Sequence, residues 1–144
     1  MLSWLKGIFQ AGVELTTGAS GERLAGEWLR RERAFAIVAS NWRSPRDRRD
    51  EIDLICRDGD ALVFVEVKTR KVGALVPGFH TVDARKKRVL RRAAEAYLAG
   101  LREKPLTFRL DVVEVAFSGK EDSSAVPEIL HFENVPLFGK HFQG

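Results

Sequence analysis

The chain has 144 residues, enough for one domain with its own core and too few for two comfortable ones. Its 24 Lys and Arg residues against 20 Asp and Glu give a formal net charge of +4, which favours a polyanionic partner without establishing one. The only cysteine, Cys56, excludes an intramolecular disulfide framework and fits a reducing, cytoplasmic compartment, where a packed thiol is expected.

Residues 1–16 form an apolar extension in which Leu2, Leu5, Ile8 and Phe9 recur at helical spacing. The segment lacks the long apolar core and the small-residue cleavage site of a secretory signal, and no stretch is apolar enough to span a membrane. We expect a short amphipathic helix that packs on the domain or on a second copy. Attachment to a membrane surface is the alternative.

A helix is predicted from Gly18 to Arg33. Glu22 falls on the same face of this helix as Ala25 and Leu29, and an acid beside an apolar stripe is unusual. Its simplest explanation is a first-turn glutamate favoured by the helix dipole, and a functional carboxylate is the alternative.

A strand is predicted at residues 35–41, and an arginine-rich loop follows it. The loop contains Arg43, Arg46, Arg48 and Arg49 together with Trp42. Cations beside an aromatic residue suit phosphate binding and base stacking, whereas a solvated loop is the alternative. We expect the arginines to contact nucleic acid and Trp42 to pack in the core.

Residues 50–70 read DEIDLICRDGDALVFVEVKTR, two arms in which apolar and polar residues alternate. This period, with many Val, Ile and Phe residues, predicts a β-hairpin. Asp58-Gly59 is expected to form its two-residue turn, so that Arg57 pairs with Asp60.

This register puts Asp53 opposite Phe64 and diagonal to Glu66, and it puts Glu51 opposite Glu66. Since side chains alternate between faces, three acids and a lysine share one face: Glu51, Asp53, Glu66 and Lys68. Diagonal neighbours lie roughly 7–8 Å apart at the backbone, a spacing from which Asp53 and Glu66 can lean onto one ion the size of Mg²⁺.

A solvent-facing ion pair is the alternative for Glu66 and Lys68, because open hairpin faces are commonly polar. However, Leu62 and Phe64 make the acidic face apolar as well, which predicts a strand buried on both faces. Unpaired charges there cost several kcal/mol, and metal coordination is a common remedy.

A second helix is predicted to begin at Thr81, with Asp83 in its first turn, and to end near Gly100. Its cations are Arg85, Lys86, Lys87, Arg88, Arg91 and Arg92. We expect the apolar side of this helix to cover the sheet and its basic face to point outward and bind phosphates, with a merely solvated face as the alternative. Strands are predicted at residues 107–117, where Arg109 and Asp111 are placed to pair, and at residues 128–134.

Two runs, EIDLI at residues 51–55 and VFVEVKTR at residues 63–70, stand out. Together they resemble the YraN family of bacterial predicted endonucleases, which are similar to Holliday junction resolvases and belong to the PD-(D/E)xK nuclease superfamily. The resemblance covers residues 17–134 and includes Gly21-Glu22. Asp50 departs from it, because the family usually has glycine at this position.

The resemblance implies a restriction-endonuclease-like α/β fold, a mixed sheet of about five strands flanked by helices, in residues 17–134. Residues 1–16 would then be an extension and residues 135–144 a tail. It also implies a cytoplasmic bacterial enzyme that uses Mg²⁺ or Mn²⁺ to hydrolyse DNA phosphodiester bonds. Branched or single-stranded DNA is a possible substrate under this resemblance, and a homodimer is a possible oligomeric state.

The catalytic residues that the resemblance implies are Glu22, Asp53, Glu66 and Lys68. Asp53 and Glu66, helped by Glu22 and the carbonyl of Val67, would hold the metal ion, while Lys68 would position the attacking water. Arg70 joins the loop arginines and the second helix as an expected nucleic-acid contact. Two other functions stay open: a nucleic-acid-binding module of this fold with weak or no cleavage, and a structural protein that dimerises through its N-terminus.

Overall fold

The computed structural model describes residues 18–71, 83–117 and 126–137. Its helices are α2 (Gly18–Arg33) and α3 (Ala84–Ala99), and its strands are β1 (Ala36–Arg43), β2 (Glu51–Asp58), β3 (Ala61–Lys71), β4 (Thr107–Phe117) and β5 (Glu128–Phe132). No helix of these residues is long and apolar enough to cross a membrane. The expectations for residues 1–16, for Thr81 and for residues 138–144 lie outside the described residues.

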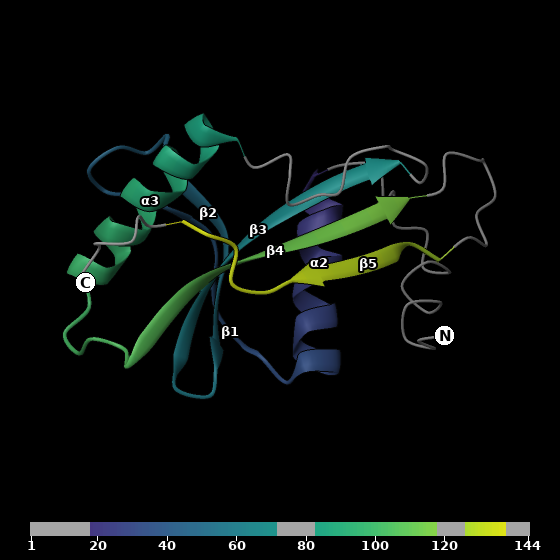
Figure 1. Cartoon of the computed structure of the whole chain (residues 1–144), viewed down its shortest axis with the longest axis horizontal. Helices are drawn as coiled ribbons and strands as arrows, with labels where there is room; N and C mark the ends of the chain where they lie inside the picture. The colour runs from purple at the N-terminus through teal and green to yellow at the C-terminus, as the bar shows by residue number, and fades with distance from the viewer. Residues whose placement is uncertain (1–17, 72–82, 118–125, 138–144) are drawn as a thin grey trace.

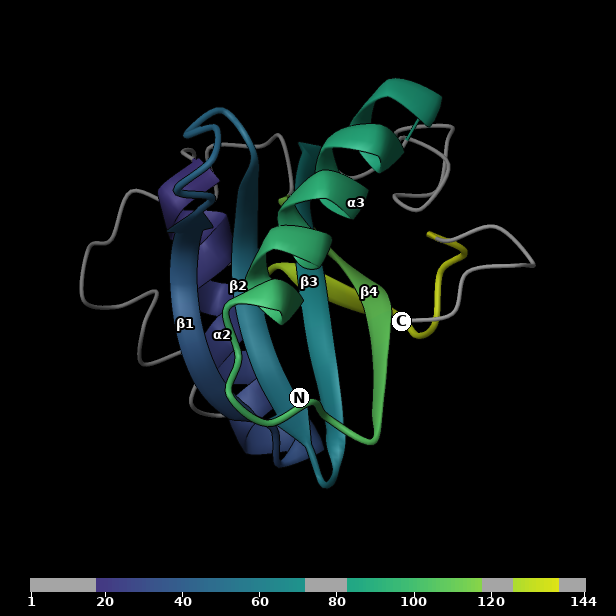
Figure 2. The ribbon, with the colours of Figure 1, turned by 90° about the vertical axis from the view of Figure 1, so that its left-hand side faces the viewer.

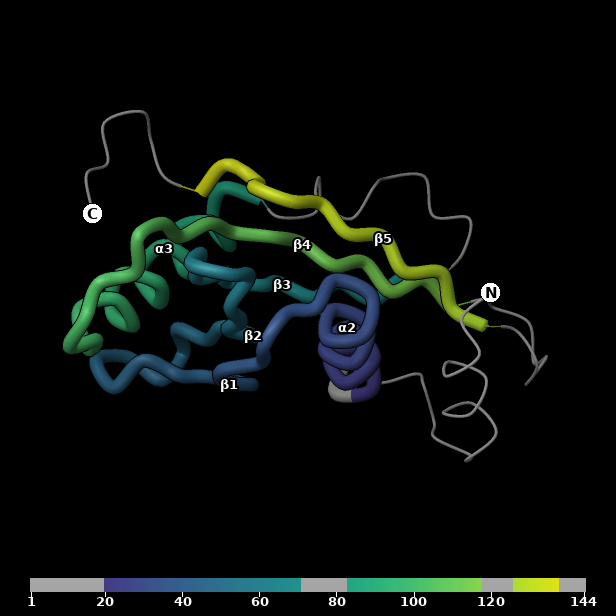
Figure 3. The backbone as a smooth tube through the Cα atoms, turned by 90° about the horizontal axis from the view of Figure 1, so that it is seen from below, coloured from purple at the N-terminus to yellow at the C-terminus, as the bar shows by residue number. Residues whose placement is uncertain are grey.

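The strands form one five-stranded mixed sheet in the order β1-β2-β3-β4-β5 (Figure 1). The first three make an antiparallel meander, β4 runs parallel to β3, and β5 returns antiparallel to β4. The parallel pair requires a long crossover, which contains α3. Viewed from below, the sheet is strongly twisted, with β1 along one edge and β5 along the other (Figure 3). The predicted α/β fold is therefore confirmed.

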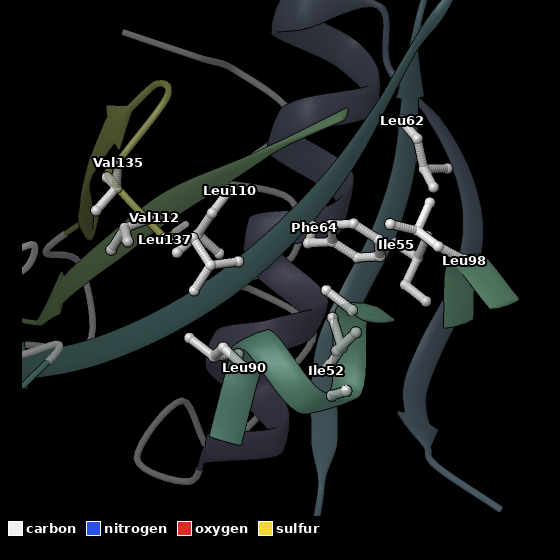
Figure 4. Packing of buried hydrophobic residues seen from close by; sticks show 12 residues of the cluster. Ile52, Ile55, Leu62, Phe64, Leu90, Leu98, Leu110, Val112, Val135 and Leu137 are labelled. Carbon is white, nitrogen blue, oxygen red and sulfur yellow. The ribbon is translucent and has the colours of Figure 1, made fainter. Parts of the chain in front are cut away.

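The helices cover opposite faces of the sheet, α3 in front and α2 behind in Figure 2. Under α3, Phe64 packs with Ile55 and Leu90 (Figure 4). Under α2, Val63 and Val65 pack with other buried residues of that side. Strand β3 is thus buried on both faces, as its sequence predicted, because consecutive residues point into different cores.

The register of the β2–β3 hairpin differs from the prediction. Asp58 pairs with Ala61, so the turn residues are Gly59 and Asp60, and Gly59 has a φ of +57°. The carboxylate of Asp58 also lies 3.0 Å from the guanidinium of Arg109 on β4, a contact that fixes Asp58 within the strand. The pairing moves by two positions, which leaves every side chain on its predicted face.

Several predicted boundaries also move. Asp83 is the N-cap of α3 and not part of its first turn, since its side chain accepts a hydrogen bond from the Lys86 N–H. Strand β5 ends at Phe132, and Asn134, with a φ of +55°, lies beyond it. The packed core reaches past residue 134 to Leu137.

Candidate active site

The candidate site lies where β2 and β3 separate. Their ladder ends at Leu54 opposite Val65, although both strands continue. One step further, where Asp53 would face Glu66, Asp53 Oδ2 instead accepts a hydrogen bond of 2.8 Å from the Val67 N–H. A carboxylate therefore takes the place of a ladder partner, which fixes Asp53 against the segment that carries Glu66. The predicted pairing of Asp53 with Phe64 is wrong, because Phe64 faces Ile55.

Glu66 is a buried carboxylate, only 3% exposed. Its Oε1 lies 3.4 Å from the Nζ atoms of both Lys68 and Lys86, while Oε2 is buried with no hydrogen-bond partner among the described residues. Burial, reinforced by the negative charge of Asp53, raises the pKa of Glu66 to about 7 despite the opposing lysines. A buried oxygen without a partner is costly, so Oε2 is the atom of Glu66 that a cation or a hydrogen-bond donor would stabilise.

Glu22 reaches the site from the first turns of α2. The helix can approach β3 closely because Gly21 has no side chain: a Cβ there would lie 2.1 Å from Thr69 Cγ2. Burial, and next the charge of Asp53, raise the pKa of Glu22 to about 7, which places the Glu22 carboxyl beside Asp53. The functional interpretation of Glu22 thus receives geometric support that its place in the helix could not give.

Asn41 is a site residue that the analysis of the sequence did not identify. Its amide nitrogen, oriented to give the neighbouring carboxylates a donor, lies 2.6 Å from Glu22 Oε2 and 3.3 Å from Glu51 Oε1. Asn41 has a φ of +50°, a conformation that asparagine tolerates better than most residues. The local sequence gave little sign of this role, because the contact joins three separate elements. The neighbouring Trp42 packs in the core against Tyr97, as expected.

Within the described ranges, no three Asp, Glu, His or Cys side chains are gathered closely enough to hold a metal ion by themselves. Mg²⁺, however, is commonly held by one or two carboxylates and completed by waters and substrate phosphates. Asp53 and Glu66, with the unpartnered Oε2, fit such an incomplete set. The part expected for the Val67 carbonyl stays a prediction, since the structure assigns a role only to the Val67 N–H.

Several of the expected nucleic-acid contacts have partners within the protein. Arg43 lies 3.2 Å from Glu51, and Arg49 lies 2.8 Å from Asp47. Arg70, whose side chain is 13% exposed, forms an ion pair with Glu114. Exposed cations of the loop and of α3 include Arg46, Arg48, Arg85 and Arg88, whereas Lys87 is half-buried.

Lys86 departs from the predicted outward face, because its ammonium turns in to Glu66. Arg92 is also engaged within the protein. Its guanidinium donates hydrogen bonds of 3.0 and 3.1 Å to the buried carboxylate of Asp50. Asp50, the residue that departs from the family pattern, therefore joins the loop to α3 and its charge is offset there.

The fold and this cluster define an α/β protein with a partly buried site of carboxylates and lysines where β2 and β3 separate. Residues 21–115 match the profile described as "Uncharacterised protein family UPF0102". The chain belongs to this family, which is the YraN family that its motifs resemble.

Relatives carry the same family description. A UPF0102 protein of Geobacter metallireducens is 39% identical over 81% of this chain and 88% of its own. A UPF0102 protein of Anaeromyxobacter dehalogenans is 42% identical over 80% of this chain and 79% of its own. A UPF0102 protein of Chlorobaculum tepidum is 40% identical over 85% of this chain and 92% of its own. Family membership thus covers most of the length of each protein.

Proposed function

We propose that this protein is an endonuclease that uses Mg²⁺ or Mn²⁺ to hydrolyse phosphodiester bonds of DNA. The observation that carries the proposal is that the Val67 N–H holds Asp53 close enough for its charge to raise the pKa of buried Glu66, while two lysines lie beside Glu66. A divalent cation between Asp53 and Glu66 would offset the repulsion between the two carboxylates and the burial of Glu66.

When bound, the ion would polarise the phosphodiester and lower the pKa of a coordinated water. The residues of the chain have distinct tasks. Asp53 and Glu66 bind the ion, and the Val67 N–H orients Asp53. Lys68 extends from the same face as Glu66 and is close enough to its carboxylate to contact a water or phosphate oxygen there. Glu22, whose carboxyl lies beside Asp53, helps these two residues to hold the ion.

The test is cleavage of labelled duplex, single-stranded, flap and four-way-junction DNA in Mg²⁺, Mn²⁺ or EDTA. We expect metal-dependent cleavage of at least one substrate, lost at least a hundredfold in Glu66→Gln and Lys68→Met. Glu103→Gln, at an exposed loop position, is the matched control and should keep wild-type activity. Cleavage that persists in EDTA or is indifferent to Glu66→Gln would refute the proposal.

A DNA-binding module with weak or no cleavage is the second candidate. The exposed arginines of the loop and of α3 favour it, because cations that face solvent attract phosphates whether or not a bond is cut. This candidate predicts salt-sensitive DNA binding without metal-dependent cleavage, and binding that Glu66→Gln and Lys68→Met leave unchanged.

A further inference from the structure

Lys86 stands apart from the other cations of α3. Its side chain is 35% exposed, yet its Nζ lies 3.4 Å from Glu66 Oε1, the same oxygen that Lys68 approaches at 3.4 Å. The Lys86 N–H is fixed by a 2.8 Å hydrogen bond to the N-cap carboxylate of Asp83. The backbone of Lys86 is therefore held in place, and its long side chain alone decides where its charge lies.

The ammonium groups of Lys68 and Lys86 both lie beside Oε1 of Glu66, whereas Oε2 has no hydrogen-bond partner among the described residues. Two like charges beside the same atom repel each other, which weakens the attraction of Glu66 for each lysine. Lys68 is tied to Glu66 by their spacing on β3, since both side chains leave the same face of one strand. Lys86 comes from another element and is the lysine that can leave.

A phosphate of a bound nucleic acid is an alternative partner for the Lys86 ammonium. Arg85 and Arg88, its neighbours in the first turns of α3, are exposed and therefore available to the same backbone of a bound nucleic acid. An ammonium–phosphate contact is charge-assisted and suits the flexible lysine stem. A cation that binds Glu66 has to compete with Lys86, whereas a phosphate that draws Lys86 away removes this competitor.

We propose that Lys86 is an exchangeable counter-ion that couples DNA binding to metal binding: it occupies Glu66 in the free protein and moves to a DNA phosphate in the complex. The inference rests on the proposed function and adds regulation to the same site. Divalent-ion affinity is then low without DNA and rises with it, and by thermodynamic reciprocity the ion raises DNA affinity by the same factor. This coupling would keep the site largely metal-free until a substrate is present.

The experiment measures Mn²⁺ affinity from free Mn²⁺ by electron paramagnetic resonance, with and without a phosphorothioate duplex, which keeps its charge and resists hydrolysis. In the wild type we expect DNA to raise the affinity at least tenfold. In Lys86→Met we expect the free protein to bind Mn²⁺ about fivefold more tightly, and DNA to raise its affinity less than threefold. Lys86→Arg keeps the charge and should remain close to the wild type.

Arg85→Met is the matched control, because it removes a neighbouring charge that is exposed. It should weaken DNA binding and leave the Mn²⁺ affinity of the free protein unchanged. Equal Mn²⁺ affinities for the folded Lys86→Met and Arg85→Met proteins, with equal gains from DNA, would overturn the counter-ion role and leave the nuclease proposal standing. Absence of Mn²⁺ binding to the wild type, with or without DNA, would overturn both proposals.

Discussion

Replacing Asp53 with asparagine should stabilise the metal-free protein at alkaline pH. The side chain keeps its shape and an oxygen that can accept the Val67 N–H, but it loses the negative charge that raises the pKa values of Glu66 and Glu22. Between pH 4.5 and about 7, Glu22 and Glu66 are protonated in the folded protein and ionised in the unfolded chain. The folded state therefore binds more protons, so the stability of the wild type falls as the pH rises through this window.

The size of the effect follows from the pKa shift of Glu66. A rise from 4.5 to about 7 corresponds to roughly 3 kcal/mol between its protonation states. Burial is the largest cause of this rise and remains in the variant, whereas the charge of Asp53, the second cause, is removed. We therefore expect the variant to regain about 1 kcal/mol of folding stability at Glu66. Glu22 is half-buried and better screened, so its contribution is smaller.

The measurement is urea unfolding at pH 5 and pH 8 in EDTA, where the free energy of unfolding is compared with that of the wild type. We expect Asp53→Asn to gain about 1 kcal/mol at pH 8 and almost nothing at pH 5. Asp60→Asn, at an exposed turn position, removes an equal charge and should show no such pH dependence. A gain that is the same at both pH values, or a loss at pH 8, would refute the reasoning.

Three other substitutions test contacts that stabilise the fold, and urea unfolding measures each of them. Gly21→Ala should lower the free energy of unfolding by about 1 kcal/mol, because the new methyl group clashes with Thr69 Cγ2. In a Thr69→Ser background, where that atom is absent, the substitution should not lower it. Equal losses in both backgrounds would contradict the clash. Arg92→Ala should lower the free energy of unfolding, because it leaves the buried Asp50 carboxylate without its guanidinium partner. In an Asp50→Asn background this loss should fall by at least half. Asp111→Asn should lower the free energy of unfolding by about 3 kcal/mol at pH 7, and the variant should lose less stability in acid than the wild type does. A loss below about 1 kcal/mol at pH 7 would refute this estimate.

The acid sensitivity arises from a buried polar cluster around Asp111. Its carboxylate accepts hydrogen bonds from Arg109 and from the Asn134 N–H and lies 2.8 Å from His131 Nε2. Burial alone would raise the pKa of Asp111, but the hydrogen bonds from His131 and Arg109 hold it below its ordinary 3.8. A lowered pKa contributes stability that is present above pH 3.8 and lost as the pH falls through the folded-state value, so acid unfolding is the measurement.

Local periodicity was sufficient to predict several features. Helix α2 has the predicted limits Gly18–Arg33, and β4 has the predicted limits Thr107–Phe117. The shared face of Glu66 and Lys68 also follows from the two-residue period of a strand, which survives an error in hairpin register. These features depend on residues close together in the chain, and the family motif lies within the same short run.

Contacts between distant elements could not be predicted in this way. Asp58 is kept in β2 by Arg109 of β4, and Asn41 joins Glu22 to Glu51 across three elements. Lys86 looked like part of an outward basic face, yet it meets Glu66.

The sequence by itself therefore determined the elements, their buried faces and the acidic residues presented by the hairpin. Only the tertiary structure decided which of these acids approach one another, which lysines lie beside Glu66 and which arginines stay exposed. The physical reason is range: side-chain periodicity is set by backbone geometry within one element, whereas separations between elements are set by how their side chains pack.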